Sequence, residues 1–266
     1  MIFPLLSITS YFISTLLLTP TLAKIQAGEQ NIKPNKELFF ITALLAVILH
    51  FFSILPLLDH ISHGEVFTLT DIGSLVSLLV AAFMTFAMLR INTMWFLLPI
   101  VYCFAIINLL FVIVMPDHVL LMLSQDVGLT IHIILALFAY ALCFIATLYA
   151  IQLSWIDHSL KNKKMTFSPI IPPLMTVERH FFRILLSAEI LLTVTLISGA
   201  LYLADFFAPQ NIQKAIFSFL AWIVFGLVLI GHQKLYWRGK RVIIYTISGM
   251  ILFTIAYFGS RAMLNI

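Results

Sequence analysis

The stretch "VGLTIHIILALFAYALCFIATLYAIQLS", from Val127 to Ser154, contains no charged residue and decides the class of fold. A helix that crosses the hydrocarbon core of a bilayer needs roughly 20 mostly apolar residues, and this run exceeds that length. The whole chain shares the bias, since 62% of its residues are hydrophobic and 10% are charged. Soluble domains carry about 25% charged residues. With a mean hydropathy of +1.09, the chain is predicted to be an all-α, polytopic membrane protein that has the lipid bilayer as its solvent.

The rest of the chain contains further apolar runs of spanning length, giving about eight in all. They lie near residues 2–22, 38–58, 68–89, 94–115, 127–154, 180–204, 214–233 and 242–262. No segment between them is long enough to fold as a separate domain outside the membrane. The sequence therefore predicts a helical bundle of about eight transmembrane helices that forms one integral membrane domain over residues 1–266.

The segments between the spans alternate in charge, which predicts the orientation. One set carries Lys24, Lys33, Lys36, Arg90, Lys161, Lys163, Lys164, Arg179, Arg183, Lys234, Arg238, Lys240 and Arg241. The other set carries mainly acids and histidines, namely Asp59, His60, His63, Glu65, Asp117, His118, Asp126 and Asp205, with Lys214 and Arg261 as its cations. Because cytoplasmic loops are rich in Lys and Arg, both termini are predicted to lie outside the cytoplasm. The polar inner loop at 155–179 is then a candidate docking site for a cytoplasmic protein.

Several function classes lack their sequence signatures. The chain has no long basic run, RNA-binding motif or Gly-rich phosphate loop, so no nucleic-acid partner is expected. It also has no hydrolase triad pattern, no HExxH helix and no Walker loop, so catalysis by protein side chains is not expected. Cys103 and Cys143 both fall inside apolar spans, where cysteine packs as a small hydrophobic residue.

His132 heads a face of its helix on which every other residue is small. The face steps by three or four residues, as helix geometry requires, through Gly128, His132, Ala136, Ala139, Cys143, Ala146 and Ala150. One interpretation is a close helix–helix contact with the histidine hydrogen-bonded across it. The other is a smooth wall for a flat ligand whose metal is bound by the imidazole. Both interpretations stay open at this point.

His50 shares a face of the second span with Ala43, Ala46 and Ser53. Helix rise places His50 about 12 Å and His132 about 8 Å from the outer ends of their helices, so the two lie at similar depth. Two neutral imidazoles at one level would suit axial ligation of a haem iron. They would equally suit a hydrogen-bonded pair.

Glu189 is the one carboxylate well inside a predicted span. An intramembrane carboxylate marks a proton or cation path in many transporters. Alternatively, burial keeps the carboxyl group neutral and bonded to a neighbouring helix. The transport interpretation gives an alternative function, a transporter or cation-flux component that uses Glu189 with Asn108 and Asp71.

Specific motifs resemble the bacterial cytochrome c assembly family, which includes the CcsA and HemX branches. They are "DIGSLVSLLVAAFMT" (71–85), "LLPIVYCFAIINLL" (97–110), "LFAYALCFIATLYAIQLSWIDHSLKNKK" (137–164), "PPLMTVERHFF" (172–182), "WRGKRV" (237–242) and "AYFGSR" (256–261). The likeness runs from the second span to the eighth. It implies an eight-helix protein of the bacterial inner membrane that handles haem.

The resemblance also implies three haem-iron ligands. "TIHIILALFAYALCF" (130–144) matches the family stretch that places a ligand histidine near the outer face, here His132. "LAWIVFGLVLIGH" (220–232) matches the segment that ends in a transmembrane histidine, here His232. His50 matches the early-helix histidine of the same relatives. The family pattern pairs His50 with His232, whereas helix rise separates those two by roughly 15 Å in depth. All three remain candidates, and His132 ranks first.

The chain departs from the CcsA branch at two places. The Trp-rich outer motif that precedes the seventh span in that branch is replaced by "SGALYLADFFAPQNIQKAIF" (198–217), which contains no tryptophan. The chain also ends in "FGSRAMLNI", without the terminal outer histidine. The resemblance therefore implies a HemX-like accessory or regulatory protein, not a synthetase that attaches haem, and not an enzyme.

Overall fold

The computed structural model describes residues 2–26, 36–62, 69–114, 127–161, 173–202 and 209–259. Within these ranges the chain is almost wholly helical and contains no strand. The elements are α1 (Ile2–Gln26), α2 (Lys36–Ser62), α3 (Leu69–Ala87), the 3-10 helix η1 (Asn92–Phe96), α4 (Leu98–Val114), α5 (Val127–Lys161), α6 (Leu174–Tyr202), α7 (Pro209–Leu235), α8 (Lys240–Thr254) and the π-helical η2 (Ile255–Gly259). The predicted all-α class is confirmed.

Seven of the described helices are long and apolar enough to cross a membrane, and the exception is α4. The protein is therefore a polytopic helical membrane bundle. The run predicted at 94–115 is divided, because η1 occupies its start and α4 begins only at Leu98, next to Pro99. Proline is tolerated in the first turn of a helix because its missing N–H has no partner there in any case. The 17 residues of α4 lie at the lower end of the spanning range of about 17–25. The orientation of the termini stays a prediction.

The inner loop is shorter than the sequence suggests, so the bounds predicted for it, 155–179, are wrong. Helix α5 continues to Lys161 and α6 already begins at Leu174. An apolar run marks the part of a helix inside the hydrocarbon core, whereas the hydrogen-bonded turns continue into the polar region. Lys163 and Lys164 lie outside the described residues.

The chain folds as two compact units, Met1–Leu123 with Ser159–Pro173, and Ser124–His158 with Leu174–Ile266. We call them unit 1 and unit 2 and describe each by itself. In unit 1, α1 and α3 each pack against both α2 and α4. Its aromatic core includes Tyr11 and Tyr102, with ring centroids 5.1 Å apart, and Phe39 and Trp95, 5.4 Å apart. That the two units form the single membrane domain predicted for the chain stays a prediction.

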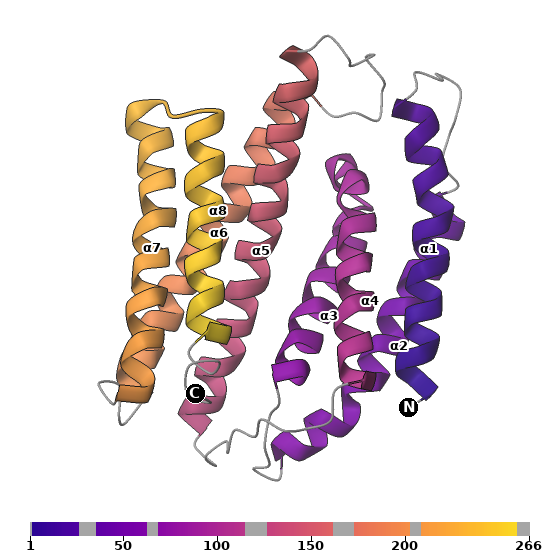
Figure 1. Cartoon of the computed structure of the whole chain (residues 1–266), viewed down its shortest axis with the longest axis horizontal. Helices are drawn as coiled ribbons and strands as arrows, with labels where there is room; N and C mark the ends of the chain where they lie inside the picture. The colour runs from indigo at the N-terminus through magenta and orange to yellow at the C-terminus, as the bar shows by residue number, and fades with distance from the viewer. Residues whose placement is uncertain are drawn as a thin grey trace. The chain divides into compact units, whose positions relative to one another are not determined.

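In unit 2, α7 packs against α6, α8 and η2. Figure 1 shows α7 and α8 as a hairpin closed by a short turn. Helix α5 joins this group through Tyr140, whose hydroxyl lies 3.0 Å from the hydroxyl of Thr254 and whose ring contacts Phe253 and Tyr257. Unit 2 thus contains two of the three candidate histidines, one on α5 and one on α7.

Candidate functional site

His50 is fully buried in unit 1 and connects three helices. Its Nδ1 lies 3.3 Å from the hydroxyl of Tyr11 on α1, and its Nε2 lies 3.0 Å from the hydroxyl of Ser74 on α3. Because both ring nitrogens have partners, the imidazole acts as a hydrogen-bonded brace. The hydrogen-bonded pair of His50 and His132 suggested by the sequence is not formed, since His50 bonds to Tyr11 and Ser74 and His132 bonds to Ser198. Iron at either nitrogen would replace one of the two bonds.

His132 is half-buried in unit 2, and its hydrogen bonds fix its tautomer. Its Nδ1 lies 3.0 Å from Oγ of Ser198 on α6, and that hydroxyl donates its hydrogen to the carbonyl of Thr195 at 2.9 Å. A hydroxyl has a single hydrogen, so Oγ of Ser198 accepts from Nδ1–H of the neutral imidazole. Nε2 therefore carries the lone pair. Metal-binding histidines are commonly held in this way, with one nitrogen donating and the other free to bind the metal.

The small residues along α5 are covered by protein. Gly128 and Ala136 are buried, and the exposed fraction of Ala139, Cys143, Ala146 and Ala150 is 0%. A face that is fully covered favours the helix-packing interpretation of the stripe. A wall for a flat ligand would need an uncovered face. His132, at the head of the stripe, is less buried than the residues that follow it.

His232, near the end of α7, has its tautomer fixed by a backbone carbonyl. Its Nδ1 lies 3.2 Å from the carbonyl oxygen of Trp237. A carbonyl oxygen only accepts hydrogen bonds, so Nδ1 carries the proton and Nε2 carries the lone pair in the neutral ring. The imidazole stacks on Phe182 of α6, with ring centroids 3.5 Å apart and planes 16° from parallel. The ring is thus held in one orientation by two separate contacts.

The turn between α7 and α8 places Trp237 opposite His232. Tyr236 has φ 54° and Gly239 has φ 63°, both in the left-handed region that reverses the chain. The N–H of Trp237 donates to the carbonyl of Gly231 at 3.0 Å. Its indole lies directly over Gly231, where an added Cβ would come within 2.4 Å of the ring. Gly231 is therefore needed for the close approach of Trp237.

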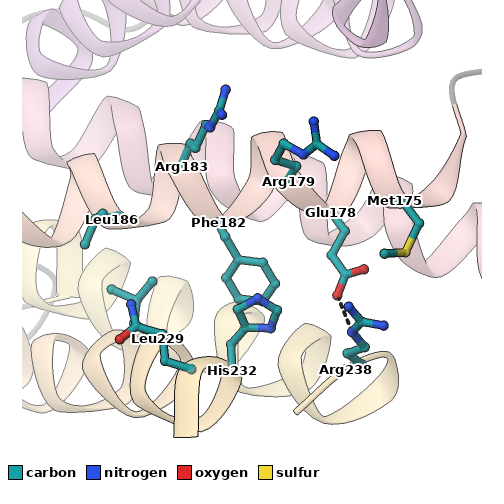
Figure 2. A pocket seen from close by; sticks show the side chains of 10 residues that line it. Met175, Glu178, Arg179, Phe182, Arg183, Leu186, Leu229, His232 and Arg238 are labelled. Carbon is teal, nitrogen blue, oxygen red and sulfur yellow. Dashed lines mark ion pairs between the residues drawn. The ribbon is translucent and has the colours of Figure 1, made fainter. Parts of the chain in front are cut away.

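An open pocket of about 340 Å³ lies beside His232. It is lined by Met175, Glu178, Arg179, Phe182, Arg183, Leu186, Leu229, His232, Gln233 and Arg238. Figure 2 shows Met175, Glu178 and Phe182 pointing from α6 toward His232 and Arg238. Oε1 of Glu178 and Nε of Arg238 form an ion pair at 3.2 Å. The volume falls within the range of about 300–1,000 Å³ that is usual for small-molecule sites.

The two candidate histidines of unit 2 do not meet. His132 contacts Ser198 and His232 contacts Phe182, so they lie against opposite ends of α6. At 1.5 Å per residue, these positions on α6 are about 24 Å apart. One iron cannot bind both imidazoles. His50 belongs to unit 1.

Glu189, on α6, has an unusual environment. Its Oε2 is buried and has no hydrogen-bond partner among the described residues. A Cβ added at Gly226 would lie 3.2 Å from Oε1 of Glu189. The glycine therefore leaves space for the carboxyl group. Asn108 and Asp71, grouped with it by the transport hypothesis, belong to unit 1. The side-chain amide of Asn108 donates to the carbonyl of Phe104 on its own helix at 2.8 Å.

Two further observations complete the placement of the histidines. His63 and His118 lie outside the described residues, as does the side chain of His60. The sequence analysis did not predict that Phe182 and the carbonyl of Trp237 contact His232. The glycine in "WRGKR" is a sequence signal that could have indicated the turn after the histidine. No sequence pattern indicated that Phe182 would stack on the imidazole.

Comparisons with known proteins agree with one another. The family model described as "Cytochrome C assembly protein" matches residues 9–266. Three relatives named "Inner membrane protein YpjD", from Escherichia coli K12, O6:H1 and O157:H7, are each 40% identical over 261 residues, which cover 98% of this chain and 97% of the relative. No solved structure matches the chain significantly. The family match spans nearly the whole chain, and the protein therefore belongs to the cytochrome c assembly protein family.

Proposed function

We propose that this chain is a haem-binding inner-membrane protein, in which Nε2 of His232 and Nε2 of His132 are axial ligands at two separate sites. The observation that carries the proposal is the fixed tautomer of both imidazoles. In each, Nδ1–H is held by an oxygen acceptor and Nε2 keeps its lone pair. Neutral imidazole with such a second-sphere bond is a common axial ligand of haem iron.

The surroundings of His232 fit a porphyrin better than those of the other histidines. Phe182, Leu186 and Leu229 give the pocket beside it an apolar wall. Haem is a largely apolar ring, and its iron takes axial nitrogen ligands and supplies redox or transfer chemistry when bound. The sequence ranked His132 first, whereas the pocket favours His232. His50 stays a candidate that would have to give up a bond to Tyr11 or Ser74.

An accessory or regulatory role fits the chain better than haem attachment. The stretch 198–217 contains no tryptophan, so it lacks the aromatic outer motif of the CcsA branch. The inner-membrane location follows from the names of the relatives and from the apolar helices of this chain. We infer a HemX-like protein that binds haem without transferring it to an apocytochrome.

Haem titration of the purified protein tests the proposal. The wild-type protein in detergent should give a Soret band with histidine-ligated features. His232→Ala and His132→Ala should each remove part of that band, because the two sites are separate. His158→Ala removes an exposed histidine from the same helix as His132 and should leave the spectrum unchanged. Absence of a Soret band after haem is added, or identical spectra from all four proteins, would contradict the proposal.

Cation or proton flux through Glu189 is the second candidate function. The buried, unpartnered Oε2 of Glu189 favours it, because such an atom needs a proton or a cation. In this case Glu189→Gln would abolish ion uptake in vesicles and leave any haem spectrum intact. Uptake at the wild-type rate in Glu189→Gln would exclude this function.

A cytoplasmic protein that docks on the inner loop stays a prediction. The cations Lys163 and Lys164 lie outside the described residues. Crosslinking from a cysteine placed between residues 162 and 170 tests this partner.

A further inference from the structure

The side of the pocket that carries Arg179 and Arg183 has no part in the proposed iron ligation. Both arginines are exposed, and both line the pocket together with Arg238. The described lining includes one acid, Glu178, and its ion pair engages Arg238. Two guanidinium groups, four residues apart on one face of α6, thus have no ion-pair partner within the part of the chain that the structure describes.

These arginines lie at one end of a stripe of exposed residues on α6. Along α6, every third or fourth residue is exposed, and beyond Arg183 all of them are apolar. The stripe consists of Met175, Arg179, Arg183, Leu186, Ile190, Val194, Ile197 and Leu201. From Leu186 to Leu201 it is about 22 Å long, most of the thickness of a bilayer's hydrocarbon core. The arginines therefore lie where this face leaves the hydrocarbon and meets the headgroup layer.

We propose that Arg179 and Arg183, whose side chains point from α6 to the side away from His232 and Arg238 (Figure 2), bind the phosphate headgroup of an anionic phospholipid at the rim of this pocket. The guanidinium forks of Arg179 and Arg183 would hold the phosphate, because Arg matches oxyanions with paired N–H donors. Leu186, the next exposed residue of the stripe, would contact the first part of the acyl chains. Basic pockets between transmembrane helices on the cytoplasmic side are known to bind anionic lipid headgroups, and the charge pattern predicts that side for these arginines.

The lipid and the iron would use different polar groups of one pocket: iron binding uses Nε2 of His232, whereas the lipid uses the exposed cations of α6, and Leu186 lines the pocket for both. The carboxylates of haem are another possible occupant of the same arginines, and free phosphate is a third. The experiment must therefore separate the three.

Native mass spectrometry of the full-length protein provides the test. The protein would be held in detergent micelles doped with dioleoylphosphatidylglycerol or, as the uncharged comparison, dioleoylphosphatidylcholine. Arg179→Gln/Arg183→Gln should bind phosphatidylglycerol about tenfold more weakly than wild type, since each cation contributes to attraction of an anionic lipid. Lys240→Gln/Arg241→Gln removes the same charge from exposed residues that do not line the pocket, and its affinity should stay within about twofold of wild type.

A second variant, Glu178→Gln, is expected to strengthen the binding of phosphatidylglycerol. It frees Arg238 and removes the acid, so phosphatidylglycerol should bind several-fold more tightly. This variant keeps the proposal testable if the double arginine variant does not fold. No gain with Glu178→Gln, or equal losses from the two double variants, would overturn the proposal in favour of diffuse charge attraction.

Two competitors distinguish the possible occupants. Inorganic phosphate at millimolar concentration should not displace phosphatidylglycerol, because it lacks the acyl chains, and effective displacement would indicate a plain phosphate site. Haem titration should give the same affinity for wild type and for Arg179→Gln/Arg183→Gln. If that variant loses haem and keeps the lipid, the arginines hold the haem carboxylates and the lipid proposal is wrong.

Discussion

Replacing Gly231 with alanine should separate Trp237 from His232. The new Cβ would lie 2.4 Å from Cε3 and 2.5 Å from Cδ2 of the indole. Carbon atoms in contact settle at about 3.5–4.0 Å, so the indole must move by about 1 Å. The bond between Nδ1 of His232 and the Trp237 carbonyl is already 3.2 Å long, at the upper end of the usual range of about 2.7–3.2 Å. A shift of this size breaks it.

Loss of that bond should weaken haem binding at His232. Removing a second-sphere partner of a ligand histidine typically lowers metal affinity about 10–100-fold. This corresponds to about 1.4–2.8 kcal/mol of binding free energy. Haem titration followed at the Soret band, in a His132→Ala background, measures the effect on the His232 site alone.

Gly226→Ala is the matched control. It makes the same substitution in the same helix. In both variants the change from glycine to alanine stabilises the helix by about 1 kcal/mol. Its Cβ would meet Oε1 of Glu189 at 3.2 Å, a carboxyl group that is not part of the His232 pocket. Gly226→Ala should bind haem as the background protein does. Wild-type-like affinity in Gly231→Ala, or an equal loss in both variants, would refute the reasoning.

Three other substitutions test the structure through thermal unfolding in detergent. His50→Ala leaves the hydroxyls of Tyr11 and Ser74 without their buried partner and should lower stability by about 2–4 kcal/mol; an unchanged midpoint would argue against the brace. Glu189→Leu removes a buried oxygen that has no hydrogen-bond partner among the described residues, and should raise stability by about 1–3 kcal/mol. A fall in its midpoint would mean that the carboxyl group has a stabilising partner. Tyr236→Gly relieves a left-handed backbone at an exposed residue, and a gain of about 1 kcal/mol is expected. Destabilisation by this change would show that the tyrosine side chain contributes to the turn.

The class of fold and most of the spans were predictable, because a helix that crosses lipid needs a long apolar run whatever it packs against. The ends of helices were less predictable. Trp155 to Lys161 is polar enough to resemble a loop, yet it continues α5, since hydrogen-bonded turns continue beyond the hydrocarbon. The start of α4 was also missed, because the apolar run begins before the backbone becomes α-helical.

The sequence names His50, His132 and His232 as candidate ligands, which stays a prediction, but it does not give the protonation of their ring nitrogens. Whether an imidazole is free to bind metal depends on which nitrogen carries the proton. That is decided by Ser198 for His132 and by the Trp237 carbonyl for His232. One partner is on a different helix and the other depends on a turn with positive φ angles. Neither can be read from helical periodicity, which gives only the face on which a residue lies.

The brace formed by His50 has a consequence for the amino-terminal helix. The imidazole links α1 to α2 and α3 through its two nitrogens, so its lone pair and its proton are both committed to holding these helices together. If the imidazole bound another group, such as a metal, it would lose a hydrogen bond to Tyr11 or Ser74, and the packing of α1 against α2 and α3 would weaken. Amide deuterium uptake along α1 would then quicken, which makes the mobility of the first helix a reporter of what happens to a side chain on the second.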